Sequence, residues 1–525
     1  MPCHLQTLIA EGLEKSRLSS RERSSEFWGS PNDAEMNLTN LLARGLAVAL
    51  CVACSVCSAS GQLLSWEAEN GAGRRAFLQG QYADAQNHFL AAINLAEQVG
   101  ADDSRMAISL NNLAALYMQE GKFPDAEQLF LEAASMQKSS SSPGDRGAIT
   151  TLTNLGVLYS KEGRYSDAES HYKSALDLRQ KLLLPGDAQR GSILCNLGTL
   201  YFVERKYSEA EPFLLSALAV QKKAVGTDPV DLATTLNNLG LVYREQTKFS
   251  DAEPYFEQAV TALGNSAESQ NPEMATILSN WAGVYQSEGK YSKAKPLFEM
   301  ALAIREKLFG PSHPEVAESL NYLADLYFLQ GRYSKAESLG QRALAIREQS
   351  LGRESIEVSE SLNNLASLYK QRHQYLKAEQ YYLRAGEILG KRLGPDNAST
   401  ARELQNLGSL YIDEGKLDQA EPILKASLDA MQKSLEPNHP DIALVYTTLG
   451  ILYLRRSDYE EAESYCQHAL DLLEKSSSPD YPTMIVALIT YANLLSATNR
   501  KAQADLFETK AMTYKAEFRE MNGVK

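Results

Sequence analysis

The sequence predicts an all-α fold, a right-handed superhelical α-solenoid of stacked antiparallel helix hairpins. Within Leu110–Ala134, apolar residues recur at helical spacing in two short runs that Gly121 separates. The pattern returns down the chain every 42 residues. Clusters of Gly, Pro and Ser between the copies forbid one continuous helix. Neither helix of a hairpin can bury its apolar stripe alone, so we expect the hairpins to stack.

Length and composition fit this single repeated core. A solenoid buries one core along its axis, so 525 residues need not mean several globular domains. Hydrophobic residues make up 44% of the chain, which is ample for such a core. The net charge of -14 argues against nucleic acid as a partner, because phosphate binding needs clustered Lys and Arg. Cys195 and Cys466 lie 271 residues apart, so we expect two unpaired thiols, at least one of them in the core.

The first sixty residues differ from the rest. Residues 1–35 are polar and mixed in charge, and we interpret them as a disordered extension or an artefact of the assigned start. Residues 36–60 combine one positive charge, an apolar run of about a dozen residues and small residues at the end, the pattern of a secretory signal peptide. The run is shorter than the roughly 20 apolar residues of a membrane span.

Met36 is then the expected start, with cleavage after Ser60 or Ala59. The mature chain is expected in the periplasm or outside the cell, with no membrane span. A retained N-terminal anchor and a cytoplasmic protein stay open as alternatives.

From residue 61 onward the chain divides into three parts. Residues 61–106 hold an imperfect N-terminal capping repeat, in which Gly80 and Tyr82 match the turn and second helix of later units. Residues 107–484 hold nine units of 42 residues, and residues 485–525 hold a degenerate C-terminal cap. The leading Leu of the first helix recurs at Leu110, Leu152, Leu194, Leu236, Leu278, Leu320, Leu362, Leu404 and Leu488.

Proline predicts where several first helices begin. His313-Pro-Glu315 and His439-Pro-Asp441 place Pro at the first helical position with an acid beside it. His313 and His439 are therefore interpreted as residues that precede a helix, and a shared metal site is not expected. The seven His of the chain show no ligand-type clustering.

Serine predicts where the second helices begin. Ser166 is followed three residues later by Glu169, which is the spacing of a capping box. Ser208 and Ser250 stand in the same relation to Glu211 and Glu253. We expect these Ser residues to start the second helices.

The motif Leu-x-x-Leu-Gly/Ala-x-x-Tyr, followed by Gly-x-Tyr, Ala, an aromatic or Leu, and Ala, resembles the tetratricopeptide repeat. Units of 42 residues that end as Phe309-Gly-Pro-Ser-His-Pro-Glu-Val-Ala317 are similar to those of kinesin light chain and its bacterial relatives. The resemblance covers about residues 66–516. It implies the solenoid fold and a protein-binding role. The heptad region that precedes the repeats in kinesin light chain is missing, so a motor-adaptor role is not expected.

One polar residue recurs two positions after the leading Leu of the first helix, about 150° from the centre of the apolar stripe at about 100° per residue. We expect it to face the inner groove of the solenoid or its edge. An Asn amide can both donate to and accept from an extended peptide backbone, and in the resembling families an asparagine ladder lines the peptide groove. The candidate peptide-binding residues are Asn112, Asn154, Asn196, Asn238, Asn280, Asn364 and Asn406.

The alternative for this ladder is that each Asn bonds a neighbouring helix and stiffens the stack, and both roles can hold together. Neighbouring positions carry mixed charges, which leave the charge of a ligand open. These positions are Arg244, Glu245, Glu318, Asp325, Glu360, Lys370, Arg402, Asp413 and Arg455.

The sequence contains no phosphate-binding loop, no nucleophile–base motif and no paired catalytic carboxylates that stand out from surface charge. We therefore expect no enzyme, no catalytic residue, no metal and no cofactor. The favoured function is a scaffold that holds a protein or peptide in the concave groove. The alternative is a structural assembly subunit of the cell envelope with no groove ligand. The partner's identity and the oligomeric state stay open.

Overall fold

The structure is a computed structural model that describes residues 65–77, 81–98, 104–139, 146–181, 188–224, 226–264, 271–475 and 481–521. Every regular element in these ranges is a helix, which confirms the all-α prediction. The expected extension at residues 1–35 and the expected signal peptide at residues 36–60 lie outside the described residues. Among the described helices, none is both long and apolar enough to cross a membrane.

The chain forms two compact units, residues 1–235 and residues 236–525. The first unit holds a helix over residues 65–77 and then α3 (Tyr82–Glu97), α4 (Ser104–Gln119), α5 (Phe123–Ser139), α6 (Arg146–Lys161), α7 (Tyr165–Lys181), α8 (Ala188–Val203) and α9 (Tyr207–Lys223). The division falls within α10 (Pro229–Glu245).

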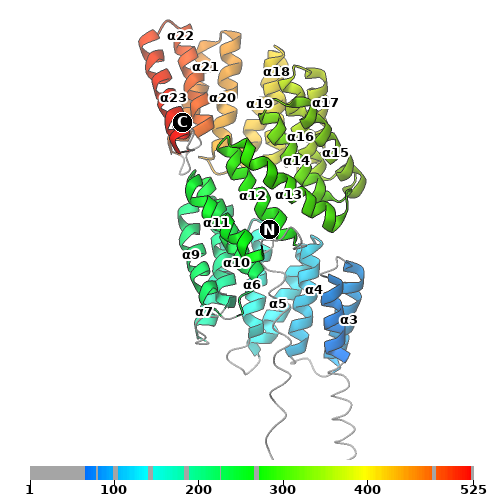
Figure 1. Cartoon of the computed structure of the whole chain (residues 1–525). Coiled ribbons are helices and arrows are strands. Elements are labelled where there is room, and N and C mark those ends of the chain that lie inside the picture. The colour runs from blue at the N-terminus through cyan, green and yellow to red at the C-terminus, as the bar shows by residue number, and fades with distance from the viewer. Residues whose placement is uncertain are drawn as a thin grey trace, which may run out of the picture. The chain divides into compact units, whose positions relative to one another are not determined.

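The second unit also consists of consecutive helices joined by short connections (Figure 1). Its helices are α11 (Phe249–Leu263), α12 (Pro272–Ser287), α13 (Tyr291–Phe309), α14 (Pro314–Leu329), α15 (Tyr333–Leu351), α16 (Ile356–Gln371), α17 (Tyr375–Leu393), α18 (Ala398–Asp413), α19 (Leu417–Ser434), α20 (Pro440–Arg456), α21 (Tyr459–Lys475), α22 (Tyr481–Ala497) and α23 (Lys501–Met521).

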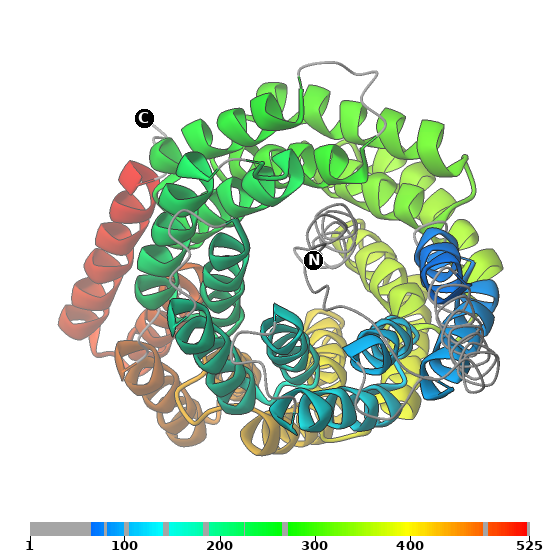
Figure 2. The same cartoon turned by 90° about the horizontal axis from the view of Figure 1, so that it is seen from below.

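Consecutive helices pair into hairpins, and the hairpins stack. In unit 2, α14 packs against α15 within one hairpin, and α15 packs against α16 of the next. The first helices also touch one another, since α14 contacts both α12 and α16. In unit 2, first helices therefore form one layer and second helices another, which can be followed in the yellow-green helices of Figure 2.

In several hairpins a small residue on the first helix faces a large one on the second helix. A Cβ added to Gly240 would lie 2.6 Å from the ring of Phe256, and one added to Gly408 would lie 2.5 Å from Leu424 Cδ2. The large residue stands four positions after the conserved second-helix Ala, and we call this place the plug position. Its occupants are Phe89, Phe130, Tyr172, Leu214, Phe256, Phe298, Gly340, Tyr382, Leu424 and Cys466.

The predicted starts of the Pro-initiated first helices are confirmed and sharpened. His313 is the N-cap of α14, and its Nδ1 accepts a hydrogen bond from the backbone N–H of Glu315 at 3.2 Å. His439 caps α20 in the same way through Asp441 at 3.2 Å. Because an N-cap acceptor satisfies one of the free N–H groups of the first turn, both imidazoles have a structural task.

The predicted capping box of the second helices is wrong. The helix α9 begins at Tyr207, and its N-cap Lys206 makes no side-chain capping bond. Likewise α11 begins at Phe249 with Lys248 as N-cap, so Ser250 lies inside the first turn.

The Glu residues of the predicted capping box form hydrogen bonds with the following repeat. Glu169 accepts a hydrogen bond from the Tyr201 hydroxyl at 2.5 Å, and Glu253 accepts one from Tyr285. Each of these Tyr lies on the first helix of the following repeat. The Ser-x-x-Glu spacing therefore reflects a tie between repeats and not a cap.

A candidate interaction site on the first-helix layer

The Asn ladder occupies one face of the first helices in the structure. Positions two and five after the leading Leu both lie about 150° from the apolar stripe, on its far side. We call the surface that these positions share the ladder face. Asn154 and Asn196 are buried, and the other five ladder Asn residues are partly exposed.

Three ladder residues bond the first helix of the preceding repeat. The Nδ2 of Asn112 donates to Asn70 Oδ1 at 2.9 Å. In unit 2, Asn280 donates to Asn237 at 2.8 Å and Asn406 donates to Asn363 at 3.0 Å. These bonds cross between first helices, so at these places the amide contributes to the stack.

The other ladder residues differ among themselves. The Oδ1 of Asn238 accepts from Asn237 Nδ2 at 3.2 Å. The Nδ2 atoms of Asn154 and Asn196 are buried and have no hydrogen-bond partner within the described part of the chain. Asn364 lines a cavity.

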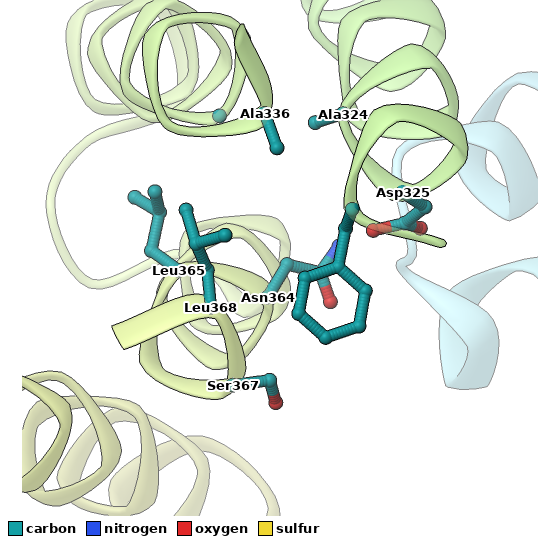
Figure 3. Close-up of a pocket in the computed structure, with 9 residues that line it drawn as sticks. Ala324, Asp325, Ala336, Asn364, Leu365, Ser367 and Leu368 are labelled. Atoms are coloured by element: carbon teal, nitrogen blue, oxygen red, sulfur yellow. The ribbon is translucent and has the colours of Figure 1, made fainter. Parts of the chain in front are cut away.

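This cavity lies in unit 2 between the hairpin α14–α15 and the helix α16. Ala324, Asp325 and Phe328 come from α14, and Ala336 and Gly340 come from α15. The remaining wall is α16, with Asn364, Leu365, Ser367 and Leu368. Figure 3 shows Asp325 and Asn364 toward one side of the cavity and Leu365 toward the other.

Gly340 is the reason for the cavity. It stands at the plug position, where the repeats before and after carry Phe298 and Tyr382. A Cβ added to Gly340 would meet Leu365 Cδ2 at 3.0 Å, so the wall opposite is a flexible side chain. Without an aromatic ring at Gly340, the space beside the small Ala324 is left partly empty.

Asp325 gives the cavity its charge. Burial alone raises the pKa of this carboxyl group to about 7, with no nearby charge contributing to the shift. Within the described residues, its side chain takes part in no hydrogen bond or ion pair. A partly buried carboxylate beside apolar side chains is poorly solvated when charged, which makes this position a candidate for binding a cation.

The other predicted positions beside the ladder are mostly paired. Lys370 bonds Asp413 at 3.2 Å, and Arg402 bonds Asp441 at 2.5 Å. The two glutamates at equivalent places bond buried arginines of the preceding second helix, Glu318 with Arg305 at 3.1 Å and Glu360 with Arg347 at 3.2 Å. Arg244 pairs with its neighbour Glu245 at 2.6 Å.

Asp325 therefore stands apart among the acidic positions of this set. Arg455, the remaining member, is exposed at the C-terminal end of α20.

Gly340 was missed by sequence reasoning, although its signal is in the sequence. Each other full repeat carries a Phe, Tyr, Leu or Cys at the plug position, and this one carries none. The break in pattern indicates a missing core side chain. Only the structure shows that Asp325 and Asn364 border the space.

The thiols and possible metal ligands do not add a second site. Cys195 and Cys466 are unpaired and buried, and burial raises the pKa of the Cys466 thiol to about 12. In the described ranges, no group of three or more His, Cys, Asp or Glu is placed to hold a metal ion.

A stack of helix hairpins with a polar ladder on the first-helix layer defines an α-solenoid of the repeat-protein class. A family model described as tetratricopeptide repeat matches seven segments that together span most of the chain. The chain belongs to the tetratricopeptide repeat family, as its sequence predicted. The matched segments are residues 67–139, 105–181, 189–264, 273–349, 357–421, 400–475 and 441–516.

Solved structures include similar chains. BtubC (BKLC) from P. vanneervenii is 27% identical over 43% of this chain and 90% of its own, with a TM-score of 0.38. A putative kinesin light chain from P. anserina, with nearly identical repeats, is 23% identical over 39% of this chain and 98% of its own, with a TM-score of 0.35.

A longer match is the apo form of the quorum sensor NprR from B. thuringiensis. It is 13% identical over 71% of this chain and 99% of its own, with a TM-score of 0.50. At this identity the likeness concerns the fold alone. A search of curated proteins gave no significant match.

Proposed function

We propose that this protein is a non-enzymatic scaffold that holds a protein or peptide partner in extended form along the ladder face. The observation that carries the proposal is the cavity at Gly340, which borders Asp325 and Asn364 of that face. A concave site with an apolar wall and a few converging polar groups is the usual form of a binding site. Membership in a family of helical repeats supports the same function.

The ladder can serve a peptide while it ties helices together. Asn280 and Asn406 each use one N–H toward the preceding first helix. An amide group has a second N–H and two acceptor positions, which remain for the backbone of a partner. A row of such groups would bind the backbone of an extended peptide whatever its side chains are.

A peptide array probed with purified protein tests this function. Asn238→Ala and Asn280→Ala remove two adjacent amides of the ladder, and we expect the double variant to bind its peptides at least fivefold more weakly. The matched control is Asn87→Ala, which removes an exposed amide from the second helix α3. Unchanged binding after both ladder substitutions would count against a role of the ladder.

The second candidate function is a structural assembly subunit of the cell envelope with no groove ligand. The inter-repeat bonds of Asn112, Asn280 and Asn406 favour it, because they give the ladder a structural task. An affinity pull-down with partner identification separates the two. Recovery of envelope components that both ladder variants also retain would favour the assembly role.

We further propose that the mature chain is exported, on the strength of the signal-peptide pattern at residues 36–60. Mass spectrometry of the mature N-terminus tests this, and we expect it to begin at residue 60 or 61. A soluble protein that keeps residues 1–60 would overturn the proposal.

A further inference from the structure

We propose that the Gly340 cavity receives a lysine side chain of the bound partner. The identity of the partner chain rests on the scaffold function proposed above. The preference of the cavity for a cation on an aliphatic stem rests on the cavity itself.

The walls of the cavity suit the stem of a lysine. Ala324, Ala336, Leu365 and Leu368 present carbon atoms, and Phe328 adds a ring. These groups line the cavity beside Gly340, where the adjacent repeats carry a Phe or a Tyr, so an inserted chain of four methylenes would gain apolar contacts there. A lysine commonly buries its methylenes along apolar surface and keeps its ammonium at a polar edge.

The polar edge suits an ammonium group. Asp325 supplies a carboxylate that has no cationic partner within the described residues. Asn364 supplies an amide group on the same side of the cavity (Figure 3). An ammonium has three donors and no acceptor, so it can bond oxygens of both groups and still reach water. A planar guanidinium favours two parallel bonds to one carboxylate and needs a wider approach, which makes lysine the better fit for a narrow plug-shaped space.

Apolar and acidic side chains of a partner would interact less favourably with the Asp325 carboxylate. An apolar side chain would cover Asp325 and remove water without supplying a bond, which is costly for a charge. An acidic side chain would be repelled. The net charge of -14 also attracts basic segments over longer distances.

Ligand-observed NMR with three short peptides tests the inference. The probes are acetylated, amidated Ala-Ala-Xaa-Ala-Ala, with Xaa as lysine, norleucine or glutamate. Norleucine keeps the aliphatic stem and removes the charge. For the wild-type protein at pH 7.5 we expect the lysine peptide to bind at least fivefold more tightly than the norleucine peptide, and the glutamate peptide to show no binding.

Three variants locate the effect. Asp325→Asn should abolish the preference for lysine over norleucine, and Gly340→Phe should abolish binding of both because the ring fills the cavity. Asp413→Asn is the matched control, since it removes one carboxylate from a first helix at a position that already pairs with Lys370. It should leave the preference unchanged. Because Gly340→Phe has to displace Leu365 and can fail to fold, Asp325→Asn decides the outcome.

Equal binding of the lysine and norleucine peptides to the wild type would overturn the inference. So would a lysine preference that survives Asp325→Asn. These short probes contact one cavity and barely engage the ladder. Failure here leaves the scaffold function standing, and failure of the ladder variants on the array leaves the cavity preference standing.

Discussion

Asp325 lowers the stability of the unliganded fold as its carboxyl group ionises, because burial leaves the charged form poorly solvated. Its carboxyl group has an ordinary pKa of 3.8, and burial raises this pKa to about 7. The folded chain therefore binds more protons than the unfolded chain between these pH values. The stability contribution is fully present below pH 3.8 and is lost as the pH rises through 7.

Asp325→Asn should therefore stabilise the protein at neutral and alkaline pH. After allowance for solvent screening at this partly exposed group, we expect a gain of about 1–2 kcal/mol at pH 8 that shrinks toward zero near pH 4. Urea unfolding followed by circular dichroism at both pH values measures it. A gain of equal size at pH 8 and pH 4 would contradict the assignment to ionisation.

The turns within several hairpins contain a residue in the left-handed backbone conformation, which glycine adopts more easily than other residues. Gly289 and Gly331 have φ of +71° and +70°, and the equivalent Thr247 has φ of +59°. A β-branched residue in this left-handed region is strained.

Thr247→Gly should stabilise its hairpin by about 0.5–1 kcal/mol, because relief of this strain exceeds the extra entropy of the unfolded glycine. Thermal unfolding of the variant beside wild type measures the change. The control is Asn499→Gly at φ +61°, where Asn already tolerates the left-handed region and a smaller gain is expected. A larger gain at Asn499 than at Thr247 would argue against the strain explanation.

At the scale of the helix, Glu421 illustrates the tie between repeats. Its carboxylate on α19 accepts from the Tyr453 hydroxyl of α20 at 2.7 Å and from Lys425 at 2.7 Å, and Arg456 completes the group. Hydrogen bonds from Lys425, Tyr453 and Arg456 lower the pKa of Glu421 from 4.5 to about 2. This stability is present above pH 4.5 and is lost as the pH falls through 2.

Glu421→Gln should cost about 0.5–1 kcal/mol at pH 7, a range already reduced for solvent screening. The cost should shrink as the pH falls below 4.5, because Glu421 is then protonated in the unfolded wild type while the folded chain keeps its charge until about pH 2. Urea unfolding at pH 7 and pH 3.5 measures both values. Glu387→Gln, which breaks an exposed pair with Lys391 within one helix, should have no measurable effect. An equal loss from the two variants would show that the tie between repeats adds nothing.

The elements predicted from sequence are those fixed by local signals. The paired short helices, their 42-residue recurrence and the Pro-initiated helix starts follow from patterns that can be read within single repeats. The predicted N-cap of the second helix, Ser250, was wrong by two residues, because Glu253 was assigned to Ser250 when its partner is Tyr285 of the next repeat.

The site was harder to predict because its contacts join residues of different repeats. The ladder positions could be named from helical spacing, but their bonds to Asn237 and Asn363 depend on how one hairpin seats on another. The cavity needs Gly340 of one repeat and Leu365 of the next. Sequence spacing within a repeat carries no information on that register.

At the scale of the whole molecule, contacts between neighbouring repeats make stability a local property. In a repeat protein each unit contacts its neighbours alone, so damage should spread one repeat in each direction and then fade.

Gly408→Ala tests this, because its new Cβ would lie 2.5 Å from Leu424 Cδ2. We expect a loss of about 1–2 kcal/mol from overpacking. Hydrogen exchange should speed up in α16 to α21, which covers this hairpin and one repeat on each side, and stay unchanged in α12 and α13. The control, Gly386→Ala in α17, has its nearest contact at 3.9 Å from Glu403 Cβ and should stabilise by about 0.5–1 kcal/mol. Faster exchange throughout unit 2 after Gly408→Ala would contradict local coupling.

Each repeat has one plug position, and the size of the side chain there controls whether a cavity forms in that repeat. One side chain per hairpin fills the space between layers, and its loss at Gly340 opens a cavity while the helices keep their places. Removing Phe298 in the same way would open a comparable space one repeat earlier, beside Tyr322 and not beside an amide. Removal of a plug side chain can therefore create a binding cavity, and the repeat in which it is removed sets the place along the solenoid where a side chain of the partner binds.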